Sequence, residues 1–207
     1  MNEKNSLGID ISFRDLSNPI ELFEVWYNEA KKTEPNDPNA LALGTSDKNG
    51  NPTVRMVLLK DFDTRGFVFY TNYESTKSNA IKENSKISMC FHWKSLLRQI
   101  RIQGNAERVS DSEADAYYNS RPYESRIGAW ASKQSSILNS RKELIDSINR
   151  YKKKYPNNNN VPRPQHWSGW RLKPNEIEFW LDGDNRIHER LKYLKRENIW
   201  DKVLLSP

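Results

Sequence analysis

The stretch Thr53-Val-Arg-Met-Val-Leu-Leu-Lys60 carries a cation near each end of an apolar, partly β-branched run. Such a run predicts a largely buried β-strand. Residues of opposite parity point to opposite faces of a strand, so Arg55 and Lys60 are expected to leave the sheet on different sides. Because an unpaired buried cation is costly, the two charges indicate anions at both ends of the strand. Solvated strand ends would explain them equally well.

Turn-forming residues bound this run on both sides. Residues 47–52 and 61–66 are rich in Asp, Asn and Gly, which favour tight turns. They connect the run to apolar segments at residues 40–45 and 67–71, which predicts an antiparallel meander. Further strands are predicted at residues 86–93, 98–108, 167–172, 176–181 and 186–190. Antiparallel strands that follow one another without intervening helices predict a β-barrel.

Helices are expected to pack around this barrel, so the fold class is mainly β with packed helices. Asn18-Pro19-Ile20-Glu21 combines an N-cap residue, a proline at the first helical position and an acid, and begins a helix. Its apolar residues recur at helical spacing and are expected to face the core. Ser110-Asp-Ser-Glu113 is a capping box before a second helix, which Pro122 ends.

A first candidate anion site lies at the start of a short helix predicted at residues 78–84. Ser75, Thr76 and Lys77 bring two hydroxyls and an ammonium to the helix N-terminus. Free backbone N–H groups and the helix dipole favour an anion there. An ordinary Ser/Thr cap is the alternative interpretation.

A second candidate site lies around the helix that Pro122 ends. Tyr117 and Arg121 are four residues apart and share a helical face, and Ser125 follows just beyond the break. A phenol, a guanidinium and a hydroxyl suit a phosphate group, which arginine can grip with two hydrogen bonds. A Tyr/Arg stack on the surface would also explain the spacing.

A third group of polar residues is predicted on the last strand. Residues 176–181 and 186–190 form a hairpin, in which Arg186, His188 and Arg190 have the same parity and face Trp180. A lone histidine is usually structural, but two flanking arginines indicate a row that faces a ligand.

Composition limits the class of protein. The chain has 207 residues, 33 Lys and Arg against 27 Asp and Glu, and a net charge of +6, which favours anionic partners. Residues 1–17 are expected to be a flexible segment, and residues 18–207 a single domain. One cysteine and the absence of a long apolar run predict a cytoplasmic protein that does not enter a membrane. The candidate cations are scattered, so nucleic-acid binding is not expected.

These motifs, in this order, resemble the pyridoxamine 5'-phosphate oxidase family from about residue 20 to Pro207. They include Arg55-Met-Val-Leu-Leu-Lys60, Ser120-Arg121-Pro122, Ile177-Glu-Phe-Trp180 and Arg186-Ile-His188. The resemblance implies an antiparallel FMN-binding split β-barrel that forms a homodimer, with FMN at the subunit interface. It also implies oxidation of pyridoxine or pyridoxamine 5'-phosphate by O2 to pyridoxal 5'-phosphate, with H2O2 and, from the amine, NH3 as further products. No metal is expected.

The resemblance assigns roles to individual residues. Arg186 and His188 are the expected catalytic residues, which orient and polarise the reacting carbon. The expected substrate ligands are Lys60, Tyr117, Arg121, Ser125, Arg186 and His188. The expected FMN ligands are Arg55, Met56, Val57, Leu58, Leu59, Lys60, Tyr70, Thr71, Thr76, Lys77, Gln99, Gln134, Ser135, Trp180 and Arg190, some of them from the other subunit.

One position departs from the family pattern. Thr76 stands where members commonly have an arginine, which weakens the expected grip on the FMN phosphate by one charge. Two alternatives to the oxidase stay open. A split-barrel flavin reductase for another substrate would share Arg55 and Lys77 without needing the substrate ligands. The other alternative is a non-enzymatic protein, either a basic protein that binds nucleic acid, which a colourless preparation would favour, or a carrier that only stores pyridoxal phosphate.

Overall fold

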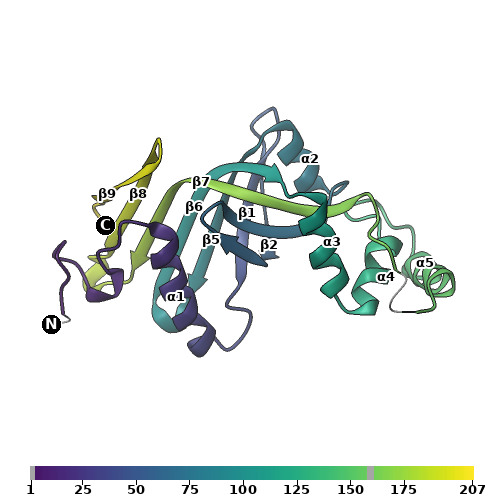
Figure 1. Ribbon diagram of the computed structural model, residues 1–207, viewed down its shortest axis with the longest axis horizontal. Helices are drawn as coiled ribbons and strands as arrows, with labels where there is room; N and C mark the ends of the chain where they lie inside the picture. Colours follow the sequence, from purple (N-terminus) through teal and green to yellow (C-terminus); the bar gives the residue numbers. More distant parts are fainter. Residues whose placement is uncertain (1–2, 158–160) are drawn as a thin grey trace.

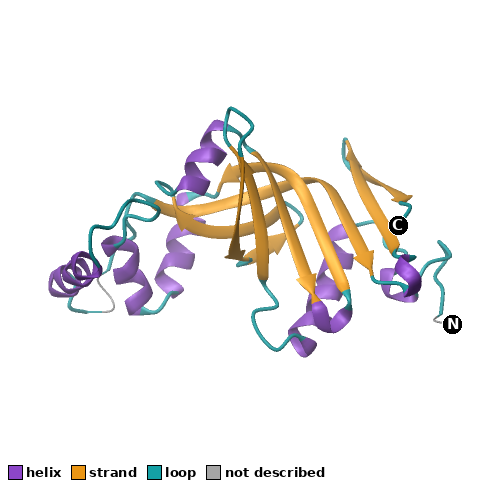
Figure 2. Ribbon diagram, turned by 180° about the vertical axis from the view of Figure 1, so that it is seen from behind, coloured by secondary structure: helices purple, strands orange, loops and turns teal. Residues whose placement is uncertain are grey.

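The computed structural model describes residues 3–157 and 161–207, and these residues contain one nine-stranded antiparallel sheet. Its main path has the strand order β2-β1-β5-β6-β7-β4-β3, with β8 on β7 and β9 on β8. The sheet curls into a half-barrel (Figure 1 and Figure 2), so the predicted mainly β, split-barrel fold is confirmed. The strands are β1 (Ala40–Ser46), β2 (Pro52–Leu58), β3 (Asp61–Asp63), β4 (Gly66–Asn72), β5 (Lys86–Trp93), β6 (Arg98–Arg108), β7 (Trp167–Leu181), β8 (Glu189–Arg196) and β9 (Ile199–Leu204).

Helix α1 (Pro19–Thr33) packs its apolar stripe against the inner face of the sheet, as its spacing predicts. The Asn18 side chain caps it by accepting a hydrogen bond from the Ile20 amide at 3.0 Å. Phe23 is fully buried, with its ring centroid 4.8 Å from that of Phe67 on β4 and 5.3 Å from that of Phe91 on β5. One helix therefore joins strands from both halves of the sheet into one core.

Strand β2 differs from its prediction as a largely buried strand. It ends at Leu58, and Val54 and Met56 are 72% and 65% exposed, because β2 is the edge of the main path and only β1 pairs with it. Lys60 follows the strand, and its amide donates to the Val68 carbonyl at 2.9 Å. The parity argument that set Arg55 and Lys60 on opposite faces is therefore wrong, since they do not share a strand.

Strand β7 replaces the two strands predicted at residues 167–172 and 176–181. It runs through Pro174 without a break, and the register with β6 shifts between Gln103 and Gly104. A β-carbon on Gly104 would lie 2.0 Å from the Lys173 carbonyl oxygen, so only glycine lets the two backbones approach this closely. The irregularity accommodates the proline, which lacks an N–H for the ladder.

The segment before β8 and the N-terminal segment each bear on a sequence-based expectation. The predicted strand at residues 186–190 is wrong in its start, because η4 (Asp184–Arg186) precedes β8 and leaves His188 outside a strand. Residues 1–17 were expected to be flexible, but the described part of this segment makes defined contacts. Its η1 (Ile11–Phe13) buries Phe13 completely, and Tyr193 on β8 donates to the Leu16 carbonyl at 2.8 Å.

The other helices lie mostly at the end of the molecule opposite β8 and β9 (Figure 1). They are α2 (Thr76–Glu83), α3 (Asp111–Ser120), α4 (Tyr123–Ala131) and α5 (Arg141–Lys154), and a short η2 (Lys94–Leu96) follows β5. In residues 3–157 and 161–207, no helix is long and apolar enough to span a membrane.

Candidate active site

Lys77 lies at the start of α2, where it is buried and its described hydrogen-bond acceptors are neutral oxygens. Its Nζ donates to Thr71 Oγ1 at 3.1 Å and to Gln134 Oε1 at 3.1 Å, and the residue is only 9% exposed. Burial, together with the charge of Arg55, lowers the pKa of Lys77. The Ser75 side chain makes no capping hydrogen bond and instead donates to the Asn72 carbonyl, so the ordinary-cap interpretation is wrong for this serine.

Arg55 is the second cation of this group. Its guanidinium donates to the Leu43 carbonyl at 3.0 Å and to Thr45 Oγ1 at 2.8 Å, which are neutral acceptors, and burial lowers the pKa of Arg55. No ion pair to Arg55 or Lys77 occurs within the described ranges. Two desolvated cations that repel each other would both be stabilised by an anion between them. The geometry therefore suits a phosphate group.

Arg121 lies in a second cationic site, where its guanidinium packs over the ring of Trp167. The guanidinium carbon lies 4.7 Å above the Trp167 ring, and its Nη1 is buried without a hydrogen-bond partner in the described structure. Burial lowers the pKa of Arg121. A buried N–H without an acceptor is costly, so this nitrogen is available for a ligand oxygen. Arg121 is the C-cap of α3 and lies just outside the helix. The prediction that Tyr117 and Arg121 share a helical face is therefore wrong.

Tyr117 joins the same site through stacked rings. Its ring lies 4.0 Å from that of Tyr70, with an interplanar angle of 16°, and Tyr70 stacks at 5.4 Å on Trp167. Burial, and then the charge of Glu113, raise the pKa of Tyr70 to about 12, so its hydroxyl stays protonated. The stack thus brings Tyr70, a predicted FMN ligand, beside Tyr117, a predicted substrate ligand.

A separate group of predicted residues surrounds Trp180. Gln99 on β6 and Arg190 on β8 are both its register partners, and the His188 ring lies 4.6 Å from its ring. Arg186 is exposed and has φ 67°, in the left-handed region that non-glycine residues rarely adopt. The predicted pairing of this segment across from Trp180 is confirmed for Arg190.

Arg190 carries a charge that its neighbours already balance. Its Nε and Nη2 donate to Glu178 Oε1 at 2.9 and 2.7 Å, and its Nη1 donates to the Ser206 carbonyl at 2.8 Å. Glu178 is 4% exposed and also pairs with Arg101 at 3.2 Å. Arg190 therefore has a carboxylate partner, whereas no described carboxylate pairs with Arg55 or Arg121.

The two groups lie at opposite ends of β7. Trp167 stands at one end, beside Arg121 and Tyr70, whereas Trp180 stands near the other end, close to β8 (Figure 1). At about 3.3 Å per residue, the strand between them spans on the order of 40 Å. One chain therefore holds two separate groups, which we call the Arg121 half-site (Arg55, Tyr70, Thr71, Lys77, Tyr117, Arg121, Gln134) and the Trp180 half-site (Gln99, Trp180, Arg186, His188, Arg190).

The family described as pyridoxamine 5'-phosphate oxidase matches residues 27–181, which are most of the chain. The chain belongs to this family. It is an oxidoreductase of the FMN-binding split-barrel class, as the sequence motifs predict. A second family, described as the pyridoxine 5'-phosphate oxidase C-terminal dimerisation region, matches residues 167–207, which include β7, β8 and β9.

Relatives of this oxidase family match over all or nearly all of the chain. The pyridoxine/pyridoxamine 5'-phosphate oxidase of Pelagibacter ubique is 67% identical and covers 100% of both chains. That of Allorhizobium ampelinum is 56% identical over 94% of this chain and 95% of its own. Among solved structures, PhzG from Burkholderia lata, in complex with tetrahydrophenazine-1-carboxylic acid, has a TM-score of 0.89 at 29% identity, covering 99% of this chain and 100% of its own.

A more distant structure has the same fold. The pyridoxamine 5'-phosphate oxidase-related, FMN binding protein from Nostoc punctiforme has a TM-score of 0.74 at 16% identity, covering 92% of this chain and 98% of its own.

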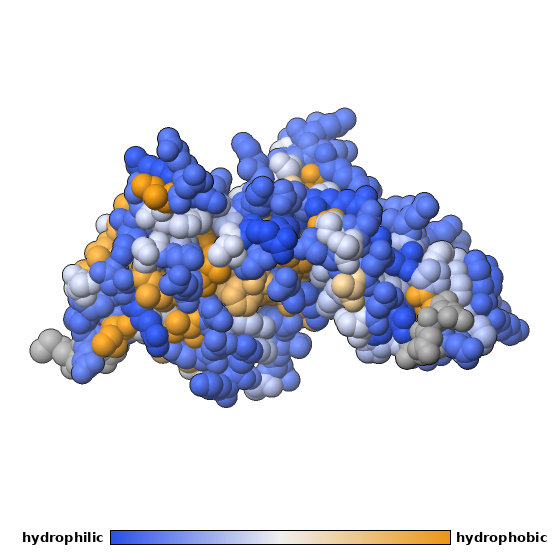
Figure 3. Space-filling model, viewed as in Figure 1, coloured by the Kyte–Doolittle hydropathy of each residue, from blue (hydrophilic) through white to orange (hydrophobic). Residues whose placement is uncertain are grey.

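The region that matches the dimerisation family exposes apolar side chains. Ile199 and Leu204 on β9 are 65% and 50% exposed, and Ile187 before β8 is 69% exposed. In Figure 3, hydrophobic surface gathers over the half of the molecule that carries the sheet and β9, whereas the helical end is largely hydrophilic. This distribution is consistent with an interface in the sheet-bearing half.

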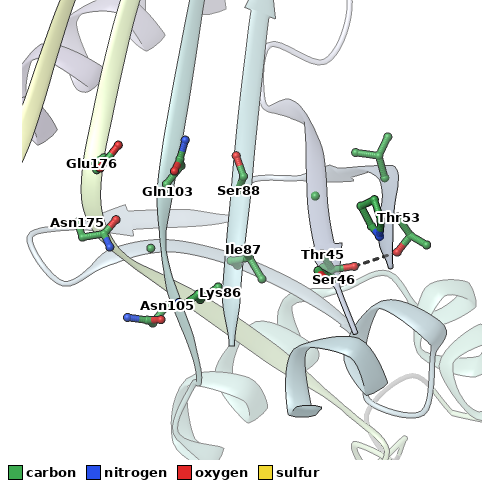
Figure 4. Close-up of a pocket in the computed structure, with 14 residues that line it drawn as sticks. Thr45, Ser46, Thr53, Lys86, Ile87, Ser88, Gln103, Asn105, Asn175 and Glu176 are labelled. Atoms are coloured by element: carbon green, nitrogen blue, oxygen red, sulfur yellow. Dashed lines mark hydrogen bonds between the residues drawn. The ribbon is translucent and has the colours of Figure 1, made fainter. Parts of the chain in front are cut away.

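A cavity of about 630 Å³ opens on the sheet beside Thr45 and Thr53 (Figure 4). Both residues accept hydrogen bonds from Arg55, so the cavity borders the Arg121 half-site. Ser88, Gln103 and Glu176 point toward it from neighbouring strands, and no predicted site residue lines it. Within residues 3–157 and 161–207, no group of three or more His, Cys, Asp or Glu is arranged to hold a metal.

The remaining predicted ligands are spread around these groups. Lys60, Thr76 and Ser135 are exposed, Ser125 is half-buried on the first turn of α4, and Met56, Val57, Leu58 and Leu59 follow Arg55 along and just beyond β2. Sequence reasoning missed Trp167 and Glu178. Neither has a role in the sequence-based assignment, since Trp167 only begins a predicted strand and Glu178 lies unassigned inside the motif Ile177-Glu-Phe-Trp180.

Proposed function

We propose that this chain is a pyridoxine/pyridoxamine 5'-phosphate oxidase that binds FMN and acts as a homodimer. The observation that carries the proposal is the pair of cationic groups without carboxylate partners, Arg55 with Lys77 and Arg121 over Trp167. The reaction needs two phosphate sites, one for the cofactor and one for the substrate. Relatives with this name, which match all or nearly all of the chain, support the assignment.

The residues near Lys77 fit the phosphate of FMN. Arg55 and Lys77 would supply its positive charges, with Thr71 and Gln134 as hydroxyl and amide partners that already surround the Lys77 ammonium. Thr76 adds no charge at this helix start, so these two cations carry the grip. FMN held there would supply the redox chemistry of the reaction, the two-electron oxidation of the substrate at C4' and the reduction of O2 to H2O2.

The chain's own residues would hold and orient the substrate. Arg121 and Tyr117, together with Lys60 and Ser125, would bind its phosphate, which fixes the pyridine ring in one position. The alcohol substrate would then give the aldehyde directly, and the amine would give an imine that water hydrolyses to release NH3. Arg186 and His188 would cover the ring and orient the reacting carbon.

The half-sites support a homodimer as the active form. The Trp180 half-site lies too far along β7 to reach Arg121 in the same chain, so its residues would come from the partner. The match of residues 167–207 to a dimerisation region supports the same arrangement.

The test is an absorbance spectrum of the purified protein, followed by assays of aldehyde and H2O2 in air. We expect a flavin spectrum that bleaches with pyridoxine 5'-phosphate in the absence of O2, and pyridoxal 5'-phosphate with H2O2 in its presence. Unphosphorylated pyridoxine is the matched control, and it should turn over poorly because Arg121 would have no anion to bind. A flavin spectrum without turnover would favour another split-barrel reductase, and a protein that binds no added FMN would overturn the proposal.

A further inference from the structure

The turn between β7 and β8 contains a carboxylate that the proposed reaction does not use. Asp182 Oδ1 lies 2.9 Å from His188 Nδ1, and the two side chains are 44% and 22% exposed. No other described side chain pairs with Asp182. The contact joins an acid without an assigned role to a histidine that the family resemblance places over the substrate.

The backbone of this turn holds Asp182 in place. The Asp182 amide donates to the Leu97 carbonyl at 2.9 Å, and the Ile187 amide donates to the Asp184 carbonyl at 3.0 Å. A β-carbon on Gly183 would lie 2.1 Å from the Ile187 carbonyl oxygen, so the two sides of the turn are in direct contact. The carboxylate is therefore presented from a closed turn rather than from a free loop.

Two groups compete for His188 Nδ1. The Gly183 amide lies 3.2 Å from it and can donate only if Nδ1 carries no proton, whereas Asp182 can accept only if Nδ1 carries one. The contact with the carboxylate is shorter and charge-assisted, so it favours the proton on Nδ1. Nε2 then carries the lone pair, and it makes no hydrogen bond to a described residue.

We propose that Asp182 is a positioning residue, which holds His188 in the Nδ1–H tautomer against Trp180 and so presents Nε2 as a hydrogen-bond acceptor. The proposal rests on the proposed function, because it gives this Nε2 a partner: the O–H or N–H group at the reacting carbon of the substrate. An acceptor at this place would orient that group for reaction. Asp182 itself would touch neither substrate nor cofactor.

The tautomer can be measured without turnover. The chain has 3 histidines, so ¹⁵N spectra of histidine-labelled protein are simple, and His188→Gln identifies the His188 signals. At a pH where the ring is neutral, we expect the Nδ1–H form in the wild type and a shift toward Nε2–H in Asp182→Asn. Asp184→Asn is the matched control, since Asp184 lies on the same turn and forms no described ion pair. An Nε2–H tautomer in the wild type would overturn the proposal.

Kinetics test whether Asp182 acts through His188. We expect Asp182→Asn to lower kcat about tenfold with little change in the KM for pyridoxine 5'-phosphate. In the His188→Gln background, Asp182→Asn should lower kcat no further, because the imidazole that Asp182 positions is absent. Equal losses in both backgrounds would overturn the positioning role. An inactive wild type would instead contradict the proposed function, and the tautomer measurement would still decide the inference.

Discussion

At the scale of single residues, Arg55 is a half-buried and Lys77 a buried cation, and neither has a carboxylate partner in the described structure. Both are desolvated and face neutral oxygens, which makes each charge more costly than a solvated one. We expect Arg55→Ala to weaken FMN binding at least about tenfold, because it removes a charge-assisted contact. Titration followed by flavin fluorescence measures this change. Arg196→Ala is the control, since Arg196 is exposed and pairs with Asp201; equal binding in both variants would show that Arg55 has another partner.

The burial of Lys77 leads to a second prediction at this scale, that the free energy of unfolding depends on pH. Its folded-state pKa is lowered from 10.5, so above that lowered value the unfolded chain binds more protons at this residue than the folded chain. The Lys77 contribution to the free energy of unfolding should therefore rise with pH up to the ordinary lysine value. Denaturant unfolding of FMN-free wild type and Lys77→Gln across this range gives the contribution as a difference. A difference that is flat or falls with pH would contradict the burial of the ammonium.

At the scale of elements, the long strand β7 depends on a close contact with β6. We expect Gly104→Ala to destabilise the fold by about 2 kcal/mol or more, because the new β-carbon would overlap the Lys173 carbonyl. Gly128→Ala is a matched control in α4, where a β-carbon meets no atom within 4 Å, and alanine favours a helix by up to about 1 kcal/mol. In thermal or denaturant unfolding, Gly104→Ala should be less stable than the wild type and Gly128→Ala more stable. Similar stabilities would show that the strand can shift at Gly104.

At the scale of the whole molecule, the half-sites predict complementation. Arg121→Ala and Arg186→Ala should each be nearly inactive, since each disables a different half-site. In a mixed dimer of the two, one site would contain both changes and the other neither. Refolding or co-expression of equal amounts should therefore restore about a quarter of the wild-type activity. No recovery, with mixed dimers shown to form, would mean that one chain supplies the whole site.

The sequence by itself determined the fold class and the family, because turns, caps and strand alternation are local signals and the motifs are ordered along the chain. The roles of the candidate site residues stay predictions. The N-cap at Asn18 and the apolar stripe of α1 follow from a few adjacent residues.

Only the tertiary structure decided which residues meet. It showed that β2 is an exposed edge strand and that β7 is continuous through Pro174. It also showed that the Arg121 guanidinium packs over Trp167, a residue 46 positions later in the chain. It also brought Asp182 to His188 through the closed turn. These features depend on packing between segments far apart in sequence, or on backbone geometry in a turn, and no local preference encodes either one.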